Sequence, residues 1–175
     1  MSEMANTLMD LAERHLRAGG FAGFSYRDLA AEAGIKSASV HYHFPTKENL
    51  VAAVLRRYKG RVADYIDQLA AEEADPVRLM AKAFGSPVHS KDKLCPCVSL
   101  GGAFSDLPGE IQGEVKGYYE MWLDRMEKQG LSRGKARTIM SMLVGAQLLA
   151  LILDDVKAYD EVADEVVKEF AAVAA

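Results

Sequence analysis

The 175-residue sequence lacks the signatures of the common enzyme classes. It contains no G-x-S-x-G nucleophile elbow, no H-E-x-x-H zinc motif and no glycine-rich phosphate loop after a strand. Adjacent carboxylates such as Asp154 and Asp155 are typical of solvated helix ends. We therefore expect a protein that is not an enzyme and that carries no cofactor.

The sequence also lacks the alternation of polar and apolar residues that marks half-buried strands. Every long segment instead repeats its apolar residues at intervals of three or four, which is the period of an amphipathic helix. Half of the residues are apolar, enough for a sizeable core and typical of an ordered globular chain. The pattern predicts an all-α protein.

No long apolar run suggests a membrane span. The longest run, IMSMLVGAQLLALIL at residues 139–153, is shorter than the roughly 20 apolar residues that a spanning helix needs. It also carries Ser141, Gly145 and Gln147, so we expect a buried helix and no membrane partner. The N-terminal SEMANTLMDLAERHL mixes charged and apolar residues at helical spacing, unlike a signal peptide, so we expect a cytoplasmic protein.

A basic excess, which nucleic-acid binders often have, is missing from the chain as a whole. The formal net charge is -4, but the two parts of the chain differ in sign. Residues 1–60 hold eight Lys and Arg against six Asp and Glu, a net charge of +2. Residues 61–175 hold thirteen against nineteen, a net charge of -6. Any DNA contact is therefore expected near the N-terminus, with affinity gained by pairing two chains.

Residues 25–50, SYRDLAAEAGIKSASVHYHFPTKENL, are punctuated as short helices joined by a tight turn. Ser25 is a typical N-cap for the first of them, and Gly34 ends that helix because glycine tolerates positive φ. Ser37 is expected to cap the second, and Thr46 a third that follows Pro45. The spacing predicts a helix-turn-helix.

The second of these helices, from Ser37 to Phe44, is mostly polar and has little to gain from burial. Only Val40 and Phe44 offer an apolar face, while the remaining side chains can reach phosphates and base edges in a major groove. An ordinary helical hairpin whose polar face meets water has the same spacing, and this alternative stays open.

The segment GIKSASVHYHFPTKENL, preceded by SYRDLAAEA and followed by a long helix, resembles the DNA-binding domain of TetR/AcrR-family transcriptional regulators. The resemblance covers residues 4–60. It implies a helix-turn-helix DNA-binding domain over residues 1–48 and a helical effector-binding and dimerisation domain over residues 49–175, about nine helices in all. It also implies a homodimer that binds double-stranded DNA at a palindromic operator, acts by default as a repressor, and is released by an unknown small-molecule effector.

The resemblance carries over to individual residues. Tyr42 takes the place of a phosphate-contacting aromatic residue and Lys47 that of a cation at the start of the next helix. His41 stands where many members have Tyr, which puts one backbone contact in doubt and would make binding pH-dependent. A neutral, partly packed histidine is the alternative for His41 and His43. The full expected DNA-binding set is Ser25, Tyr26, Arg27, Lys36, Ser37, Ser39, His41, Tyr42, His43 and Lys47.

The C-terminal domain is expected to begin with a helix over residues 47–73, followed by a short helix from Pro76 that gives way to a loop at Gly85 and Pro87. A helix is expected from Ser132 to Leu153, and its part over residues 138–153 is apolar nearly all round, so it needs cover on two sides. A second subunit is one source of that cover, which favours a dimer. The alternative is a single bundle that buries the helix without a partner.

Methionine and aromatic residues cluster in the same domain. Such side chains fill irregular space and adapt to varied ligands, although a plain core has the same composition. In TetR-like regulators this region encloses the inducer, whose binding would move the long helix and separate the two DNA-binding heads. The expected pocket residues are Met80, Phe84, Phe104, Tyr118, Tyr119, Trp122, Met126 and Met142.

Cys95 and Cys97 are the only cysteines. They follow a loop that contains Lys91 and Lys93, and Cys97 is expected near a helix start, where the dipole and nearby cations lower a thiol pKa. Three hypotheses stay open: inert buried thiols, a redox or electrophile sensor, and a metal site formed by His89, Cys95 and Cys97. Two alternatives to the regulator as a whole also stay open, namely a helical protein-interaction module and a nonspecific DNA binder without an effector.

Overall fold

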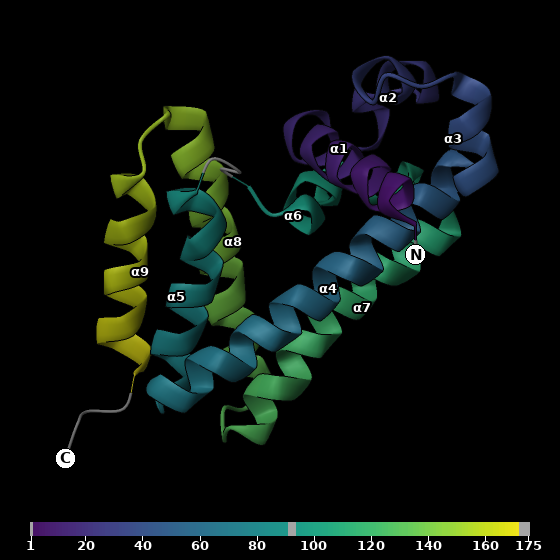
Figure 1. Ribbon diagram of the computed structural model, residues 1–175. Coiled ribbons are helices and arrows are strands. Elements are labelled where there is room, and N and C mark those ends of the chain that lie inside the picture. The colour runs from purple at the N-terminus through teal and green to yellow at the C-terminus, as the bar shows by residue number, and fades with distance from the viewer. Residues whose placement is uncertain (1, 91–93, 172–175) are drawn as a thin grey trace. The chain divides into compact units, whose positions relative to one another are not determined.

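A computed structural model describes residues 2–90 and 94–171 of the chain, and all secondary structure among them is helical (Figure 1). Nine α-helices and two short 3-10 helices follow one another, which confirms the predicted all-α class and helix number for the described residues. The elements are α1 (Glu3–Gly19), η1 (Phe21–Gly23), α2 (Tyr26–Glu32), α3 (Ser37–His43), α4 (Lys47–Glu72), α5 (Pro76–His89), α6 (Pro96–Gly101), η2 (Phe104–Asp106), α7 (Gly109–Lys128), α8 (Arg133–Leu153) and α9 (Lys157–Phe170).

Internal contacts divide the chain into two compact units. The first consists of Met1–Gly60 and Cys95–Tyr118, and the second of Arg61–Leu94 and Tyr119–Ala175. The long helices α4 and α7 each contribute residues to both. The two predicted domains, 1–48 and 49–175, divide the chain by function rather than by packing, and that division stays a prediction.

The helix ends of the first unit follow local sequence signals. Ser25 accepts a hydrogen bond from the Asp28 N–H and forms a capping box with it, and Gly34 has a φ of +66°. Thr46 Oγ1 accepts from the Asn49 N–H at 3.2 Å, as expected of an N-cap. One cap differs from the prediction: α3 begins at Ser37 itself, so Lys36 occupies the N-cap position and makes no side-chain cap bond.

In the second unit, α5, α8 and α9 lie side by side (Figure 1). The prediction of a loop at Gly85 and Pro87 is wrong, because helix α5 continues through both residues to His89. Gly85 allows a close helix approach: a Cβ at this position would lie 2.9 Å from Cε1 of Tyr159 on α9. Tertiary packing therefore overrides the local preference of glycine and proline for turns.

Helix α8 has an unusual distribution of side chains. It buries Gln147 but leaves a series of large apolar side chains on the surface of the chain. By length and composition alone it is the one helix in the described part of the chain that would be able to cross a membrane, with 39% of its most apolar window buried. The exposed apolar residues are Met142 in the middle of α8 and, at its end and just beyond it, Leu148, Leu149, Leu151, Ile152, Leu153 and Val156.

Candidate functional site

Helix α3 presents a polar outer face. Val40 is fully buried and Phe44 nearly so, which holds the helix on α2, while Tyr42 has 84% of its surface exposed. Lys36 and His41 are also exposed. The arrangement is the one expected of a recognition helix, because apolar side chains fix the helix and polar side chains point to solvent.

The remaining predicted DNA-contacting residues of this region divide by exposure. Arg27, at the start of α2, and Ser37, at the start of α3, are exposed, and their side chains make no hydrogen bond with any residue that the structure describes. Ser39 and His43 are half-buried, and the His43 ring packs edge-on against Tyr42 at 5.2 Å between ring centroids. The exposed members are therefore available for contact, and the half-buried ones support them.

Tyr26 occupies a different place from the one predicted. Its ring is buried, and its hydroxyl donates to the backbone carbonyls of Phe44, at 2.9 Å, and Thr46. Burial raises its pKa far above the usual value, and the Glu48 carboxylate adds to the rise. The His41 ring packs edge-on against Tyr26 at 4.8 Å. Tyr26 thus ties α2 to the turn after α3 through its buried ring and its hydroxyl.

Lys47 is also held by the protein. Its ammonium group donates to the Phe24 carbonyl and lies over the rings of Phe21 and Phe24, 4.7 and 4.3 Å from their centroids. Burial lowers its pKa, against the opposing effect of nearby carboxylates. The cation is therefore half-buried at the start of α4, joining that helix to the segment before α2.

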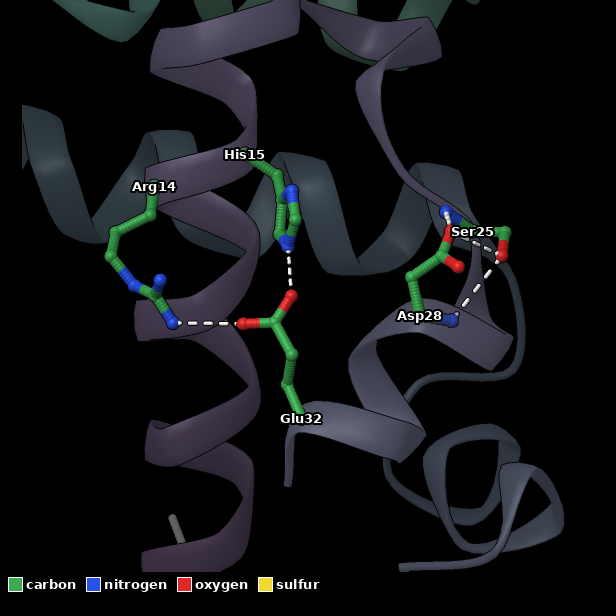
Figure 2. A network of polar contacts seen from close by, with 5 residues as sticks. All are labelled: Arg14, His15, Ser25, Asp28 and Glu32. Carbon is green, nitrogen blue, oxygen red and sulfur yellow. Dashed lines mark hydrogen bonds and ion pairs between the residues drawn. The ribbon is translucent and has the colours of Figure 1, made fainter. Parts of the chain in front are cut away.

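Figure 2 shows the polar network that fixes α1 against α2. The Glu32 carboxylate receives Arg14 at 3.0 Å and faces His15 Nε2 at 2.5 Å, and the hydrogen bond with His15 is the main cause of its lowered pKa. At the other end of α2, the Ser25 hydroxyl and N–H both donate to Asp28 and lower the pKa of that carboxyl. The Ser25 hydroxyl is therefore committed to the cap.

The eight predicted pocket residues do not form one lining. Phe104 and Tyr118 belong to the first unit, and the other six to the second. Five are buried core residues, whereas Met142 is exposed. The prediction grouped them by chemical type, but helix periodicity turns most of them inward to pack against neighbours. The buried five are Met80, Phe84, Tyr118, Trp122 and Met126.

The second unit carries a surface cleft of about 850 Å³ that the sequence did not suggest. It lies between the last turns of α4 and the facing sides of α5 and α9, and none of the eight predicted residues lines it. His89 and Asp160, 2.9 Å apart, bridge α5 and α9 at the cleft. The residues that line the cleft also include Tyr65 and the small residues Ala81 and Gly85.

Two buried polar atoms of the second unit have no hydrogen-bond partner among the described residues. They are Nε1 of Trp122 on α7 and Oε1 of Gln147 on α8. The amide nitrogen of Gln147 donates to the Phe84 carbonyl at 2.6 Å, and the Phe84 ring packs on Trp122 at 4.8 Å between centroids. Gln147 was not expected among the functional residues, because the apolar run around it gives no sign of which way it points.

The two cysteines lie at the start of α6 in the first unit, both fully buried and reduced. Burial alone would raise the pKa of Cys95, but hydrogen bonds from the Cys97 thiol, the Tyr58 hydroxyl, the Val98 N–H and the Tyr118 hydroxyl outweigh it and lower the pKa to about 6. Burial and the neighbouring Cys95 raise the pKa of Cys97. The thiol whose pKa is lowered is therefore that of Cys95, whereas the sequence had pointed to Cys97.

The residues of the weak metal alternative have other contacts. His89 faces Asp160, and the cysteines face tyrosines. No three His, Cys, Asp or Glu side chains within residues 2–90 and 94–171 are grouped so as to hold a metal ion. Lys91 and Lys93, which were expected to act on the thiols, lie outside the described residues.

Known bacterial regulators resemble the chain in sequence. The profile of the family described as "Bacterial regulatory proteins, tetR family" matches residues 8–54, from α1 into α4. The HTH-type transcriptional repressor KstR2 of Mycolicibacterium smegmatis is 27% identical over 136 residues, which is 74% of this chain and 66% of the relative. KstR2 of Rhodococcus jostii is 35% identical over 75 residues, 38% of this chain and 37% of the relative. The chain thus spans less than two thirds of the length of these relatives.

Solved structures resemble the chain over nearly its whole length. A TetR transcriptional regulator from Legionella pneumophila has a TM-score of 0.85 at 26% identity, covering 97% of this chain and 98% of its own. A TetR-family regulator from Agrobacterium tumefaciens has a TM-score of 0.85 at 24% identity, covering 96% and 97%. The latter likeness shows the fold alone, and both agree with the helical order seen here.

Proposed function

We propose, from the premise that the chain belongs to the tetR family of bacterial regulatory proteins, that it is a homodimeric transcriptional repressor that binds a palindromic DNA operator. It acts without catalysis, in the cytoplasm where its DNA lies. The observation that carries this proposal is the outer face of α3, where Lys36, His41 and Tyr42 are exposed on a helix fixed from behind by Val40 and Phe44.

The DNA contacts follow from which side chains are free. Tyr42 and Ser37 offer hydroxyls to phosphates or base edges, and Lys36 and Arg27 offer cations. His41 is exposed on α3, with its Nδ1 3.3 Å from the Pro45 carbonyl. Tyr26 and Lys47 support this surface instead of contacting DNA, because their polar atoms are bound to backbone carbonyls. The resulting contacts are few, so affinity depends on two copies of α3 acting together.

The second copy of α3 comes from a second chain. The end of α8 and the residues just after it expose six large apolar side chains, among them Leu149, Ile152 and Leu153. A contiguous apolar surface of this kind is typical of a subunit interface. Because a two-fold interface uses the same patch on both chains, α8 of one subunit covers α8 of the other, and the two recognition helices then meet half-sites about one turn of DNA apart.

Release from DNA is proposed to follow binding of a small molecule in the second unit. Helix α4 belongs to both units, so a ligand that shifts its second half also acts on the half that follows α3. The ligand releases DNA only to the extent that it binds the DNA-free state more tightly.

Thiol modification is the second proposed route of release, and the contacts of Cys95 support it as the acceptor. The Cys95 thiolate adds to an α,β-unsaturated carbonyl compound, forming a C–S bond, and water protonates the resulting carbanion. The added group does not fit beside Tyr58 and Tyr118. It would displace α6, which is anchored to α1 by a 2.6 Å hydrogen bond from the Ser99 hydroxyl to the Leu16 carbonyl.

Selection of DNA tests the main proposal. The protein is incubated with a pool of random duplexes, and the bound fraction is sequenced over several rounds. We expect enrichment of an inverted repeat whose half-sites are centred about one helical turn apart. Binding without enrichment indicates a nonspecific binder, and no binding at low salt indicates a protein-interaction module, so either result contradicts the proposal.

Alkylation tests the thiol route separately. N-ethylmaleimide is expected to abolish DNA binding by the wild type and by Cys97→Ser, whose hydroxyl still donates to Cys95, but not by Cys95→Ser. If Cys95→Ser loses DNA binding on alkylation as fully as the wild type does, Cys95 is not the acceptor.

A further inference from the structure

Within its described part, the core of the second unit contains one hydrogen-bond donor and one hydrogen-bond acceptor that have no partner. Nε1 of Trp122 and Oε1 of Gln147 have no partner among the described residues, although both side chains are only 1% exposed. Buried polar groups in folded proteins are almost always hydrogen-bonded, so an unused pair in one small region calls for an explanation.

Phe84 connects the two atoms. Its carbonyl accepts the amide nitrogen of Gln147 at 2.6 Å, and its ring packs on the indole of Trp122. The first contact fixes the orientation of the amide, because turning it over would place two oxygen atoms against each other. The Gln147 carbonyl oxygen is therefore turned away from the Phe84 carbonyl, and Phe84 contacts both side chains whose polar atoms lack a partner among the described residues.

The surroundings of the pair are neutral and adaptable. Gln147 is the only polar or charged residue among the buried residues of the second unit, within its described part. A charged ligand would have no counter-ion here, and burying an unpaired charge is strongly unfavourable. The second unit also buries three methionines, whose unbranched side chains can rearrange. They are Met80, Met126 and Met140.

We infer that this core binds a neutral, mainly apolar molecule with a hydroxyl group, which accepts a hydrogen bond from Trp122 Nε1 and donates one to Gln147 Oε1. A hydroxyl group provides both functions, whereas an ether only accepts and a hydrocarbon does neither. This inference rests on the proposed function, because it gives the chemical class of the effector and assigns its recognition to Trp122 and Gln147.

Three probes of matched shape test the inference: 1-octanol, its isomer heptyl methyl ether, and nonane. Trp122 is the only tryptophan in the chain, so intrinsic fluorescence reports on the site directly. We expect a saturable red shift with 1-octanol, at least about tenfold weaker binding of the ether because it lacks the donor, and no red shift with nonane. The absence of a saturable shift with 1-octanol, or equal affinity for the alcohol and the ether, overturns the inference.

Two variants assign the preference to these residues. Gln147→Met removes both amide atoms at similar length, and we expect it to bind the alcohol and the ether equally. Gln68→Met, an exposed position on α4, is the matched control and should keep the preference. If Gln147→Met does not fold, Trp122→Phe, followed by thermal shift, should lose most of the stabilisation by 1-octanol. Retention of the preference in Gln147→Met, or undiminished stabilisation by 1-octanol in Trp122→Phe, overturns the inference.

The same protein samples are titrated with the selected DNA. DNA binding together with no alcohol preference rejects the ligand inference and leaves the repressor proposal intact. An alcohol preference in a protein that binds no DNA rejects the repressor proposal, and the ligand site stands.

Discussion

Helices α3 and α8 distribute their side chains in opposite ways. Helix α3 buries apolar Val40 and exposes polar residues such as Tyr42, whereas α8 buries polar Gln147 and exposes apolar residues such as Ile152. Helix α3 has the single inward apolar side of an ordinary surface helix, whereas α8 exposes a second apolar side besides the one that it buries. We propose that the polar face of α3 and the exposed apolar face of α8 meet different partners.

The chemistry of each face indicates its partner. A polar face with cations and hydroxyls gains most from phosphates and base edges, because each contact is a hydrogen bond or an ion pair. An apolar face gains most from another apolar face, since removal from water is the driving force. The buried Gln147 of α8 points to a third partner, a small molecule with a hydroxyl group.

Charging the apolar face of α8 should have the largest effect. The double variant Leu149→Glu, Ile152→Glu places unpaired charges where the second chain is expected, at a cost of about 3 to 5 kcal/mol. We predict a monomer in sedimentation velocity and at least about 100-fold weaker DNA binding. Lys128→Glu, an exposed change at the end of α7, should remain dimeric. If the double variant is still a dimer, the exposed apolar face of α8 is not the subunit interface.

Removing the hydroxyl group of the most exposed aromatic residue of α3 should have the next largest effect. Tyr42→Phe deletes one hydroxyl, and a dimer loses that contact twice, so about 2 kcal/mol or a 30-fold decrease in DNA affinity is expected. Urea unfolding should be unchanged, because the side chain is 84% exposed. Unchanged anisotropy titrations with Tyr42→Phe would mean that α3 presents its polar face to water only.

The variant Tyr26→Phe distinguishes a residue that supports α3 from one that contacts DNA. The variant removes a hydroxyl that serves the Phe44 and Thr46 carbonyls, so the free energy of unfolding should fall by about 1 to 3 kcal/mol. DNA affinity, measured well below the unfolding transition, should change less than in Tyr42→Phe. The opposite order of effects would place Tyr26 among the DNA contacts.

Ionisation of the buried Cys95 thiol has the smallest predicted effect. The substitution that tests it changes neither the surface of α3 nor that of α8. The pKa of Cys95 is about 6 in the folded protein and near 8.5 in an unfolded chain, so the folded state releases this proton at lower pH. The contribution of this thiol to the free energy of unfolding is fully present above pH 8.5 and is lost as the pH falls through 6. The unfolding free energy should therefore rise between pH 6 and 8.5 more steeply in the wild type than in Cys95→Ser. Parallel curves would show that Cys95 stays protonated.

The features that the sequence predicted correctly depend on neighbouring residues. Ser25, Gly34 and Thr46 act within three or four positions of themselves, so the ends of the helices around α3 were predictable. The polar character of α3 was equally visible, although Tyr26 shows its limit, since the buried direction of its ring depends on α3 packing against α2.

The features that were missed depend on distant contacts. Gly85 was taken for a turn but serves close packing against Tyr159, more than 70 positions away. The ionisation of Cys95 depends on Tyr58 and Tyr118, and the unsatisfied carbonyl of Gln147 on an amide contact with Phe84. No spacing rule reveals such pairs, because they arise only when helices assemble.

A titration of the selected inverted repeat across a salt series tests the central claim, that α3 binds DNA as one of a pair. Fluorescence anisotropy gives the affinity, and sedimentation gives the number of chains on each duplex. We predict two chains per duplex and a linear fall of log affinity with log salt, with affinity for a scrambled duplex much weaker at every salt concentration. One chain per duplex, or equal affinity for the two sequences, would contradict the account.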